Sequence, residues 1–176
     1  GCDINIFLNF TKYVPNSQIK KLKYTYRNSQ ELIDISTKFV MKNKSQIKKK
    51  LLSHKHLDKP IEFIYYINPY IVFKKLYNKL KKENNDLLIL GRNNFDINKF
   101  SKEEIKEFMS VHSSKGLEAE NVILINLTDG LYGFPNKIIN SKLIEELHPS
   151  DKTYLYAEER RLFYVALTRT RNKVYI

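Results

Sequence analysis

The chain has few cysteine, glycine and proline residues, which are the residue types that most restrict or loosen a backbone. Cysteine occurs once, at Cys2, so neither an internal disulfide framework nor a cysteine-rich zinc site can be built. That composition fits a reducing, intracellular setting. Glycine and proline number only 5 each, which leaves little room for a flexible linker, and there is no repeat of fixed period. We therefore expect a single compact domain over residues 1–176.

Long apolar runs are also missing. No window reaches the roughly 18 to 20 apolar residues that cross a bilayer, and the first residues lack the basic-then-apolar pattern of a secretion signal. We expect a cytoplasmic location and no membrane partner. The apolar content of 42% is nevertheless ample for one buried core, which excludes a disordered chain.

Acidic residues are scarce beside basic ones. There are 31 Lys plus Arg and 19 Asp plus Glu, for a formal net charge of +12, so a polyanion such as nucleic acid is the first partner to consider. The chain is also rich in Lys, Asn and Ile together, a combination that AT-rich coding produces without selection for nucleic-acid contact. Charge alone does not decide between these two explanations.

Hydrophobic periodicity predicts strands that alternate with helices. Strands are expected at residues 19–26, 61–67, 86–91, 108–111, 121–127 and 173–176, and helices from 29 to about 42, at 69–82 and at 158–168. The run 121–127 is nearly all apolar, as in a central parallel strand covered on both faces. The pattern predicts an α/β domain with a mainly parallel sheet, helices on both faces, and ligand sites at the carboxyl ends of the strands.

An aromatic residue and an arginine, Tyr26 and Arg27, stand just before the first long helix. Residues 28–31 are typical of a helix N-cap with Glu31 as its reciprocal partner. The N–H groups of a helix start attract phosphate, an arginine supplies a forked cation, and a tyrosine offers a face for base stacking. Taken alone, a core aromatic and a surface charge are the commoner roles for these two residues.

The polar segment 111–118, VHSSKGLE, lies between two predicted strands. Its small hydroxyls, its lysine and Gly116 allow close backbone approach to phosphates. No GxxxxGK pattern occurs anywhere in the chain, so a complete phosphate-binding loop is not encoded. His112 is equally well explained as a structural histidine.

Arg169 follows the carboxyl end of the predicted helix 158–168. A cation there complements the helix dipole, which is the structural explanation. The functional explanation is an arginine directed across a domain cleft at a transferring phosphoryl group.

Three segments, TYRNSQEL, VHSSKGLE and EERRLFYVALTRTR, resemble motifs IV, V and VI of the UvrD/Rep-type superfamily 1 DNA helicases, in that order. Over essentially its whole length the chain resembles their second RecA-like motor domain, with a motif spacing nearest to the helicase IV branch. The resemblance implies a RecA-like fold without its own phosphate-binding loop. Only residues 41–106 separate motifs IV and V, so no full accessory insertion is expected.

The resemblance also implies a nucleotide site. Tyr26 would stack on the adenine of ATP, Glu118 would contact the ribose, and Arg27 and Arg169 would reach the γ-phosphate as the catalytic arginines. The magnesium ion that accompanies ATP would be held by the amino-terminal RecA-like domain of the same protein, a partner that this chain lacks. We therefore expect no metal ligands here and no ATP hydrolysis by the chain alone.

A DNA track is implied as well. His112 and Ser113 would touch single-stranded DNA, and Arg92 and Asn93 match the position of a DNA-facing loop. Single-stranded DNA or a duplex junction is the expected partner, with 3′-to-5′ polarity taken from the family. Two alternatives stay open: a noncatalytic basic module that holds phosphates through counterion release, and the helicase half of an AddA/RecB-type helicase-nuclease.

Overall fold

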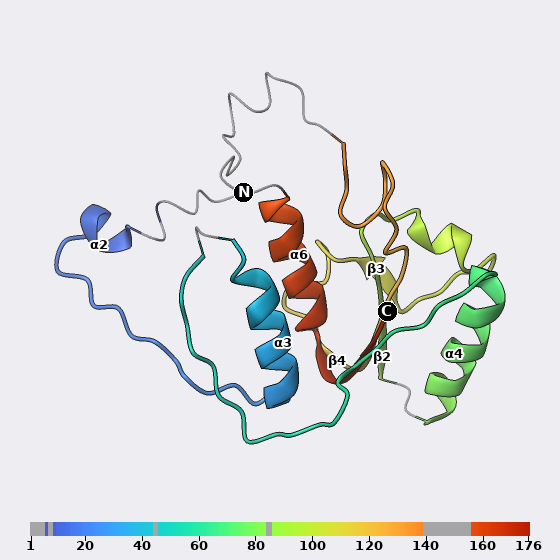
Figure 1. Ribbon diagram of the computed structural model, residues 1–176, viewed down its shortest axis with the longest axis horizontal. Helices are drawn as coiled ribbons and strands as arrows, with labels where there is room; N and C mark the ends of the chain where they lie inside the picture. The colour runs from blue at the N-terminus through green and yellow to red at the C-terminus, as the bar shows by residue number, and fades with distance from the viewer. Residues whose placement is uncertain (1–5, 7–8, 44–45, 84–85, 139–155) are drawn as a thin grey trace.

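The computed structural model describes residues 6, 9–43, 46–83, 86–138 and 156–176, so that Cys2 lies outside the described residues. A five-stranded parallel sheet forms the centre, in the order β1-β5-β4-β2-β3 (Figure 1). The strands are β1 (Ile61–Glu62), β2 (Leu87–Gly91), β3 (Phe108–Ser110), β4 (Ala119–Leu124) and β5 (Thr170–Tyr175). The predicted α/β class with a parallel sheet is confirmed.

Helices cover both faces of this sheet, as predicted. The helices are α2 (Phe10–Tyr13), α3 (Gln30–Val40), α4 (Pro69–Glu83) and α6 (Ala157–Leu167), together with a 3-10 turn, η1 (Asp96–Lys99). Helix α6 packs on one face with α3 beside it, and α4 packs on the other (Figure 1).

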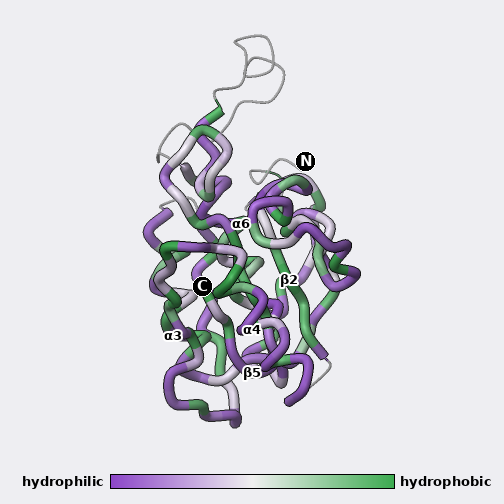
Figure 2. The backbone as a smooth tube through the Cα atoms, turned by 90° about the vertical axis from the view of Figure 1, so that its right-hand side faces the viewer, coloured by the Kyte–Doolittle hydropathy of each residue, from purple (hydrophilic) through white to green (hydrophobic). Residues whose placement is uncertain are grey.

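The alternation of side chains along the strands explains the two layers. Leu88, Val122 and Val174 pack towards α6, whereas their neighbours Leu87, Ile123 and Tyr175 pack towards α4. All five residues of β2 are buried, and Figure 2 shows this strand as hydrophobic among largely hydrophilic connections. Continuous apolar runs such as β2 and β4 are therefore strands covered on both sides.

Two strand predictions are corrected. The segment 19–26 forms only an isolated bridge between Tyr24 and Leu52, and Ile19 and Leu22 are exposed. Its alternating pattern has no sheet face to bury against, so it does not become a strand. The predicted strand 61–67 shrinks to β1 at the sheet edge, although the Ile64 N–H still donates to the carbonyl of Ile176 at 2.6 Å.

The start of α3 also differs from the prediction in one contact. The Ser29 hydroxyl caps the helix by accepting from the N–H of Leu32 at 3.4 Å. Glu31 does not turn back to the cap. Its carboxylate accepts from the N–H of Leu57 at 2.9 Å and lies 2.8 Å from Nδ1 of His56, so it ties the segment around residue 56 to the helix.

Because every strand pair is parallel, all the strands begin on one side of the sheet and end on the opposite side. These two sides are called here the amino edge and the carboxyl edge, as distinct from the outer strands β1 and β3. The strands begin at Ile61, Thr170, Ala119, Leu87 and Phe108, which mark the amino edge, and they end at Glu62, Tyr175, Leu124, Gly91 and Ser110, which mark the carboxyl edge. The segment 111–118 leaves the end of β3 and reaches the start of β4, so it runs from the carboxyl edge to the amino edge. In the part of the chain that the structure describes, no helix has both the length and the apolar character to cross a membrane.

Candidate functional site

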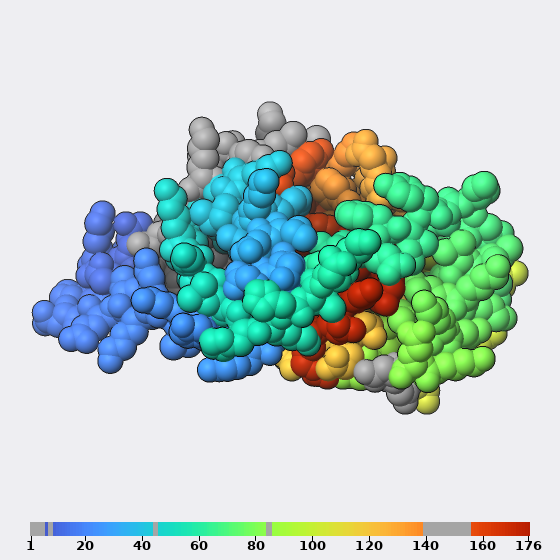
Figure 3. Space-filling model, turned by 60° about the horizontal axis from the view of Figure 1, so that its bottom comes forward, coloured from blue at the N-terminus to red at the C-terminus, as the bar shows by residue number. Residues whose placement is uncertain are grey.

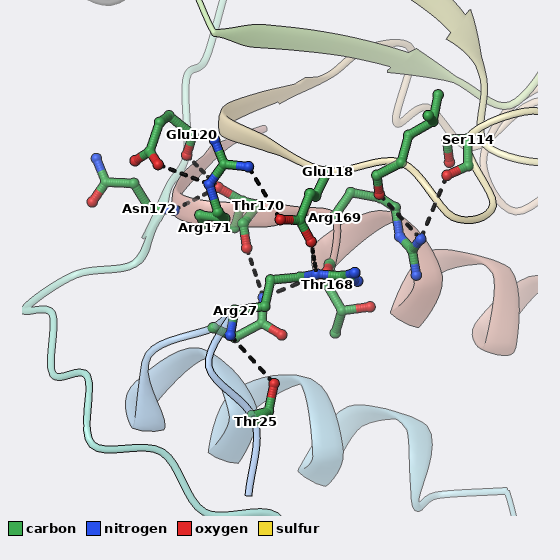
Figure 4. Close-up of polar contacts among 12 residues, drawn as sticks. Thr25, Arg27, Ser114, Glu118, Glu120, Thr168, Arg169, Thr170, Arg171 and Asn172 are labelled. Carbon is green, nitrogen blue, oxygen red and sulfur yellow. Dashed lines mark hydrogen bonds and ion pairs between the residues drawn. The ribbon is translucent and has the colours of Figure 1, made fainter.

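Arg27, Glu118 and Arg169 meet at the amino edge of the sheet (Figure 4). Glu118 immediately precedes β4, Arg169 precedes β5, and Arg27 precedes α3. This corrects the expectation that Arg27 and Glu118 follow strands at the carboxyl edge, whereas Arg169 follows the end of a helix as predicted. The expectation failed because 19–26 is not a strand and because 111–118 carries Glu118 along the length of the sheet.

One carboxylate joins two arginines at this edge. The Arg27 Nε–H donates to Oε2 of Glu118 at 2.5 Å, and the Arg171 Nη1–H donates to Oε1 of the same side chain at 3.1 Å (Figure 4). The hydrogen bond from Arg171, and then that from Arg27, lowers the pKa of Glu118. Glu118 is therefore ionised at neutral pH. Its contact with Arg27 joins two residues that are 91 positions apart in the sequence.

Arg171 is a member of this cluster that the sequence did not single out. Its Nε–H donates to Glu120 at 2.8 Å, and its Nη2 group pairs with Asp86, in addition to the contact with Glu118. These carboxylates, Glu120 first, raise the pKa of Arg171. The sequence carried no signal for this role, because the partners of Arg171 lie between 51 and 85 residues away along the chain.

Arg169 is held by backbone carbonyls. Its Nε–H donates to Val165 in the last turn of α6 at 3.1 Å, and its Nη1 group donates to Leu117 at 3.2 Å and to Ser114 at 3.4 Å. Burial, and then the positive charge of Arg27, lowers the pKa of Arg169. Two guanidinium groups thus lie close enough to repel each other, an arrangement that an anion between them would relieve.

Tyr26 projects from the same edge. Its side chain is 86% exposed, so the core role that is commoner for tyrosine does not apply here. The backbone behind it is fixed, because the buried side chain of Asn28 donates to the carbonyl of Thr170 at 2.7 Å. Figure 3 shows residues of the last strand recessed between the segment around residues 50–60 and α4. The edge therefore offers an accessible aromatic ring beside two cations.

At the carboxyl edge, Arg92 follows β2 and is fully engaged in an ion pair. Its Nε–H lies 3.0 Å from both oxygens of Glu159, and its Nη2 group donates to Oε1 at 2.8 Å. The two side chains are 19% and 14% exposed. Glu159 also accepts from the N–H of Asn136 at 2.9 Å. This pair ties the end of β2 to the first turn of α6.

Asn93 belongs to a buried polar network next to that ion pair. Asp96 is completely buried and accepts from the N–H of Asn93 and from Nδ2 of Asn126, each at 2.8 Å. The side chain of Asn93 donates to the carbonyl of Tyr132 at 2.9 Å. Gly91 permits this packing, since a Cβ there would lie 2.9 Å from the Cβ of Asp96.

His112 and Ser113 are exposed where β3 ends. Protein atoms around the imidazole, and then the charges of Arg92 and Lys115, lower the pKa of His112, so the ring is neutral at pH 7. The hydroxyl of Ser113 lies 3.0 Å from that of Ser110. The structure thus brings His112 and Arg92 together at the carboxyl edge and separates both from Arg27 and Arg169.

Among the described residues no group of three or more His, Cys, Asp or Glu side chains is arranged to hold a metal ion. The carboxylates of the amino edge are instead neutralised by arginine: Asp86, Glu118 and Glu120 all contact Arg171.

Comparison with known proteins places these segments in a family context. Residues 104–176 match the model of the UvrD-like helicase C-terminal domain. DNA helicase IV of Escherichia coli (strain K12) is 32% identical over 182 residues, which cover 99% of this chain and 27% of the helicase. The ATP-dependent DNA helicase Rep of Buchnera aphidicola is 39% identical over 80 residues, covering 45% of this chain and 10% of that protein.

The chain therefore spans about a quarter of the length of the helicase that it matches throughout. A solved C-terminal domain of a possible DNA helicase from Lactobacillus plantarum WCFS1 has 15% identity and a TM-score of 0.46, covering 86% of each chain. The similarity of this chain to helicases is a similarity of sequence, because a structural likeness of this degree carries no argument.

Proposed function

The chain belongs to the UvrD/Rep-type superfamily 1 helicases as a C-terminal domain, and from this premise we propose that it is the second motor lobe of an ATP-dependent DNA helicase. The observation that carries the proposal is that Arg27 bonds to the carboxylate of Glu118 and Arg169 to the neighbouring carbonyl of Leu117, next to the exposed Tyr26, in a chain without a phosphate-binding loop. Two arginines and an exposed aromatic ring, without a phosphate-binding loop, are what a domain needs in order to contact a nucleotide that another domain holds.

In this proposal ATP is bound between this lobe and an amino-terminal RecA-like lobe of the same protein. Tyr26 stacks on adenine, Glu118 contacts the ribose, and Arg27 and Arg169 contact the γ-phosphate. The residues fit these roles, since a guanidinium offers paired donors to phosphoryl oxygens and an exposed tyrosine offers a free face. The magnesium ion is held by the amino-terminal lobe, in keeping with the local carboxylates being occupied by Arg171.

The arginines act by stabilising the charge that develops on the transferring phosphoryl group. In related phosphoryl-transfer sites an arginine supplied across an interface contributes about 10³ to 10⁵ in rate. In the full-length protein, where the other lobe holds the phosphates, Arg27 and Arg169 reach the γ-phosphate only when the two lobes close, whereas free ATP at millimolar concentration can reach both arginines in the isolated lobe. Release of the γ-phosphate as inorganic phosphate after hydrolysis would remove the charge that Arg27 and Arg169 contact, so that the cleft would reopen and the lobe would move along DNA.

Single-stranded DNA is proposed to bind at the opposite, carboxyl edge. His112 and Ser113 are exposed there, whereas Arg92 and Asn93 are engaged in fixing the loop after β2. We assign direct DNA contact first to His112 and Ser113, with Arg92 and Asn93 shaping the surface beside them. The segment 111–118 joins this edge to Glu118, so it couples DNA to the nucleotide site.

We further propose that residues 1–176 form one such domain without a full accessory insertion, and that the enzyme moves with 3′-to-5′ polarity. The second candidate is a noncatalytic nucleic-acid-binding module, which the net charge of +12 favours. The helicase half of an AddA/RecB-type helicase-nuclease is a third arrangement of the same motor.

Phosphate release in the presence of single-stranded DNA tests the motor proposal. The full-length protein should hydrolyse ATP and respond to DNA, whereas the 176-residue chain should release no phosphate with or without DNA. Turnover by the isolated chain would contradict the half-site. A full-length protein that binds DNA without any ATP turnover would favour the noncatalytic module.

A further inference from the structure

Arg171 contacts no part of the nucleotide in the function proposed above, yet among the described residues it has the most extensive ion-pair network at the amino edge. Three of its nitrogens contact three different carboxylates: Nε with Glu120, Nη1 with Glu118 and Nη2 with Asp86. These carboxylates flank the starts of β2 and β4, next to the start of β5. A guanidinium fixed in three directions is a rigid anchor for the groups that it holds.

Glu118 divides its two oxygens between a fixed partner and an exchangeable one. Oε1 faces Arg171, while Oε2 accepts from Arg27 at 2.5 Å. Within the described residues, Arg27 has a contact with one carboxylate, whereas Arg171 contacts three. If one of the two contacts of Glu118 is given up, the contact with Arg27 is therefore the one that can break without dismantling the cluster.

An arriving phosphate competes for Arg27 on favourable terms. The side chains of Arg27 and Glu118 are 32% and 35% exposed, and a pair exposed to this extent changes an equilibrium by about fivefold or less. A phosphoryl group carries more charge than a carboxylate and accepts paired hydrogen bonds from a guanidinium. A phosphoryl group could also lie between Arg27 and Arg169 and relieve the repulsion between their positive charges. Glu118 accepts from Arg27 and not from Arg169.

We propose that Arg171 is a positioning residue that holds Glu118 in place while Arg27 transfers from Glu118 to the nucleotide phosphate, which frees Oε2 of Glu118 to accept a hydrogen bond from a ribose hydroxyl. This inference rests on the proposed nucleotide site. It makes sugar recognition depend on phosphate binding, because the same oxygen serves Arg27 before the exchange and the ribose after it. An inorganic polyphosphate would take Arg27 and leave that oxygen without a partner.

The first test follows the arginine Nε–H signals of the 176-residue chain by NMR during titration with millimolar ATP. The signal of Arg27 should shift as its hydrogen bond to Glu118 is replaced, while that of Arg171 should stay in place because its bond to Glu120 persists. Equal shifts of both signals would overturn the positioning role and leave the nucleotide site standing. No shift of Arg27 would overturn the inference and the nucleotide site together.

The second test measures discrimination of the ribose hydroxyls in the full-length protein, as the ratio of KM for 2′- and 3′-deoxy-ATP to KM for ATP. We expect about a tenfold ratio for the hydroxyl that Glu118 receives, the scale of one hydrogen bond to a charged group. Glu118→Gln and Arg171→Gln should bring the ratio close to one. Arg171→Gln should leave kcat for ATP within about twofold, because Arg171 does not touch the phosphate.

Lys173→Gln is the matched control, since it removes a cation from the same strand, and it should keep the wild-type ratio. Inorganic tripolyphosphate provides the opposite readout: Glu118→Gln should be inhibited about fivefold more strongly than the wild type, because Arg27 is no longer held back. Arg171→Lys, which keeps a charge, guards against a folding defect and should show an intermediate ratio with an unchanged melting temperature. An unaltered ratio in Arg171→Gln, with normal melting, overturns the positioning role.

Discussion

The two edges of the sheet carry the same kind of ion pair in opposite settings. At the amino edge, Arg27 and Glu118 are each about one-third exposed, and the neighbouring Tyr26 is 86% exposed. At the carboxyl edge, Arg92 and Glu159 are 19% and 14% exposed, and the next residue, Asn93, donates its N–H to the buried Asp96. We propose that the first pair can be exchanged for a ligand, whereas the second ties β2 to α6.

This difference shows that residue type does not define a functional arginine. Desolvation makes a buried charge dependent on its partner, so removing either member of such a pair is costly. Solvent screens an exposed pair, which lets the guanidinium change partners at little cost. Four experiments, in order from the largest expected effect to the smallest, test the residues at the two edges and the segment beside the start of α3.

The largest effect is expected at Arg169. In the full-length protein, Arg169→Ala should reduce DNA-stimulated ATP hydrolysis by about 10³ to 10⁵, because the phosphoryl charge loses its cation. Arg169→Lys should do little better, since lysine lacks the planar fork. The measurement is steady-state turnover at saturating DNA, with thermal melting as the control.

The competing explanation for Arg169 makes a different prediction. If this arginine only complements the end of α6, where it donates to Val165, both variants would lose about 0.3 to 1 kcal/mol of stability and keep near-normal turnover. Near-normal hydrolysis by Arg169→Ala would remove the residue from the site.

The contrast between the edges is tested directly by truncating one arginine from each. Arg92→Ala should lower the free energy of unfolding by about 2 to 3 kcal/mol, because Glu159 is left with little exposure and one fewer partner. Arg27→Ala should lower it by about 1 kcal/mol or less. Urea unfolding of the isolated chain gives both values. Equal losses for the two variants would show that the edges do not differ as proposed.

DNA binding should be weak and sensitive to salt, and it should map to the carboxyl edge. The isolated chain is expected to bind a labelled single strand without sequence preference, with affinity that falls steeply as salt rises. His112→Ala should weaken binding a few-fold more than Tyr26→Ala does, because Tyr26 lies at the other edge. Tight, salt-insensitive binding to one particular sequence, or equal losses in the two variants, would be inconsistent with this assignment.

The smallest effect concerns Glu31, which secures the segment around residue 56 beside the start of α3. Hydrogen bonds from the N–H of Leu57 and then from His56 lower the pKa of Glu31 from 4.5 to about 2. Since the folded pKa is the lower one, the contribution of Glu31 to stability is present above pH 4.5 and is lost as the pH falls towards 2. Melting of Glu31→Gln should therefore lie below that of the wild type at pH 7 and approach it near pH 2.5.

Glu104→Gln, which removes an exposed glutamate, is the control for that experiment and should melt with the wild type throughout. A constant difference between Glu31→Gln and the wild type from pH 7 to pH 2.5 would show that the carboxylate of Glu31 is not the group responsible.

The sequence by itself determined the features that depend on local pattern. Continuous apolar runs predicted β2 and β4, an amphipathic run behind a proline predicted α4, and alternation of strands with helices predicted a parallel sheet with two covered faces. The motif strings also identified Arg27, Glu118 and Arg169 as members of one candidate site. Periodicity and motif order are properties of neighbouring residues, so they can be recognised before the chain folds.

Only the tertiary structure decided which residues meet. Arg27 and Glu118 are 91 residues apart, and Arg92 and Glu159 are 67 apart, so no local sequence pattern predicts either ion pair. The same limit applies to residues 19–26, whose alternating side chains pack against no sheet, so that no strand forms. It applies also to Arg171, whose three carboxylate partners lie at the starts of two other strands. Exposure, which separates an exchangeable arginine from a fixed one, arises only when distant segments pack around it.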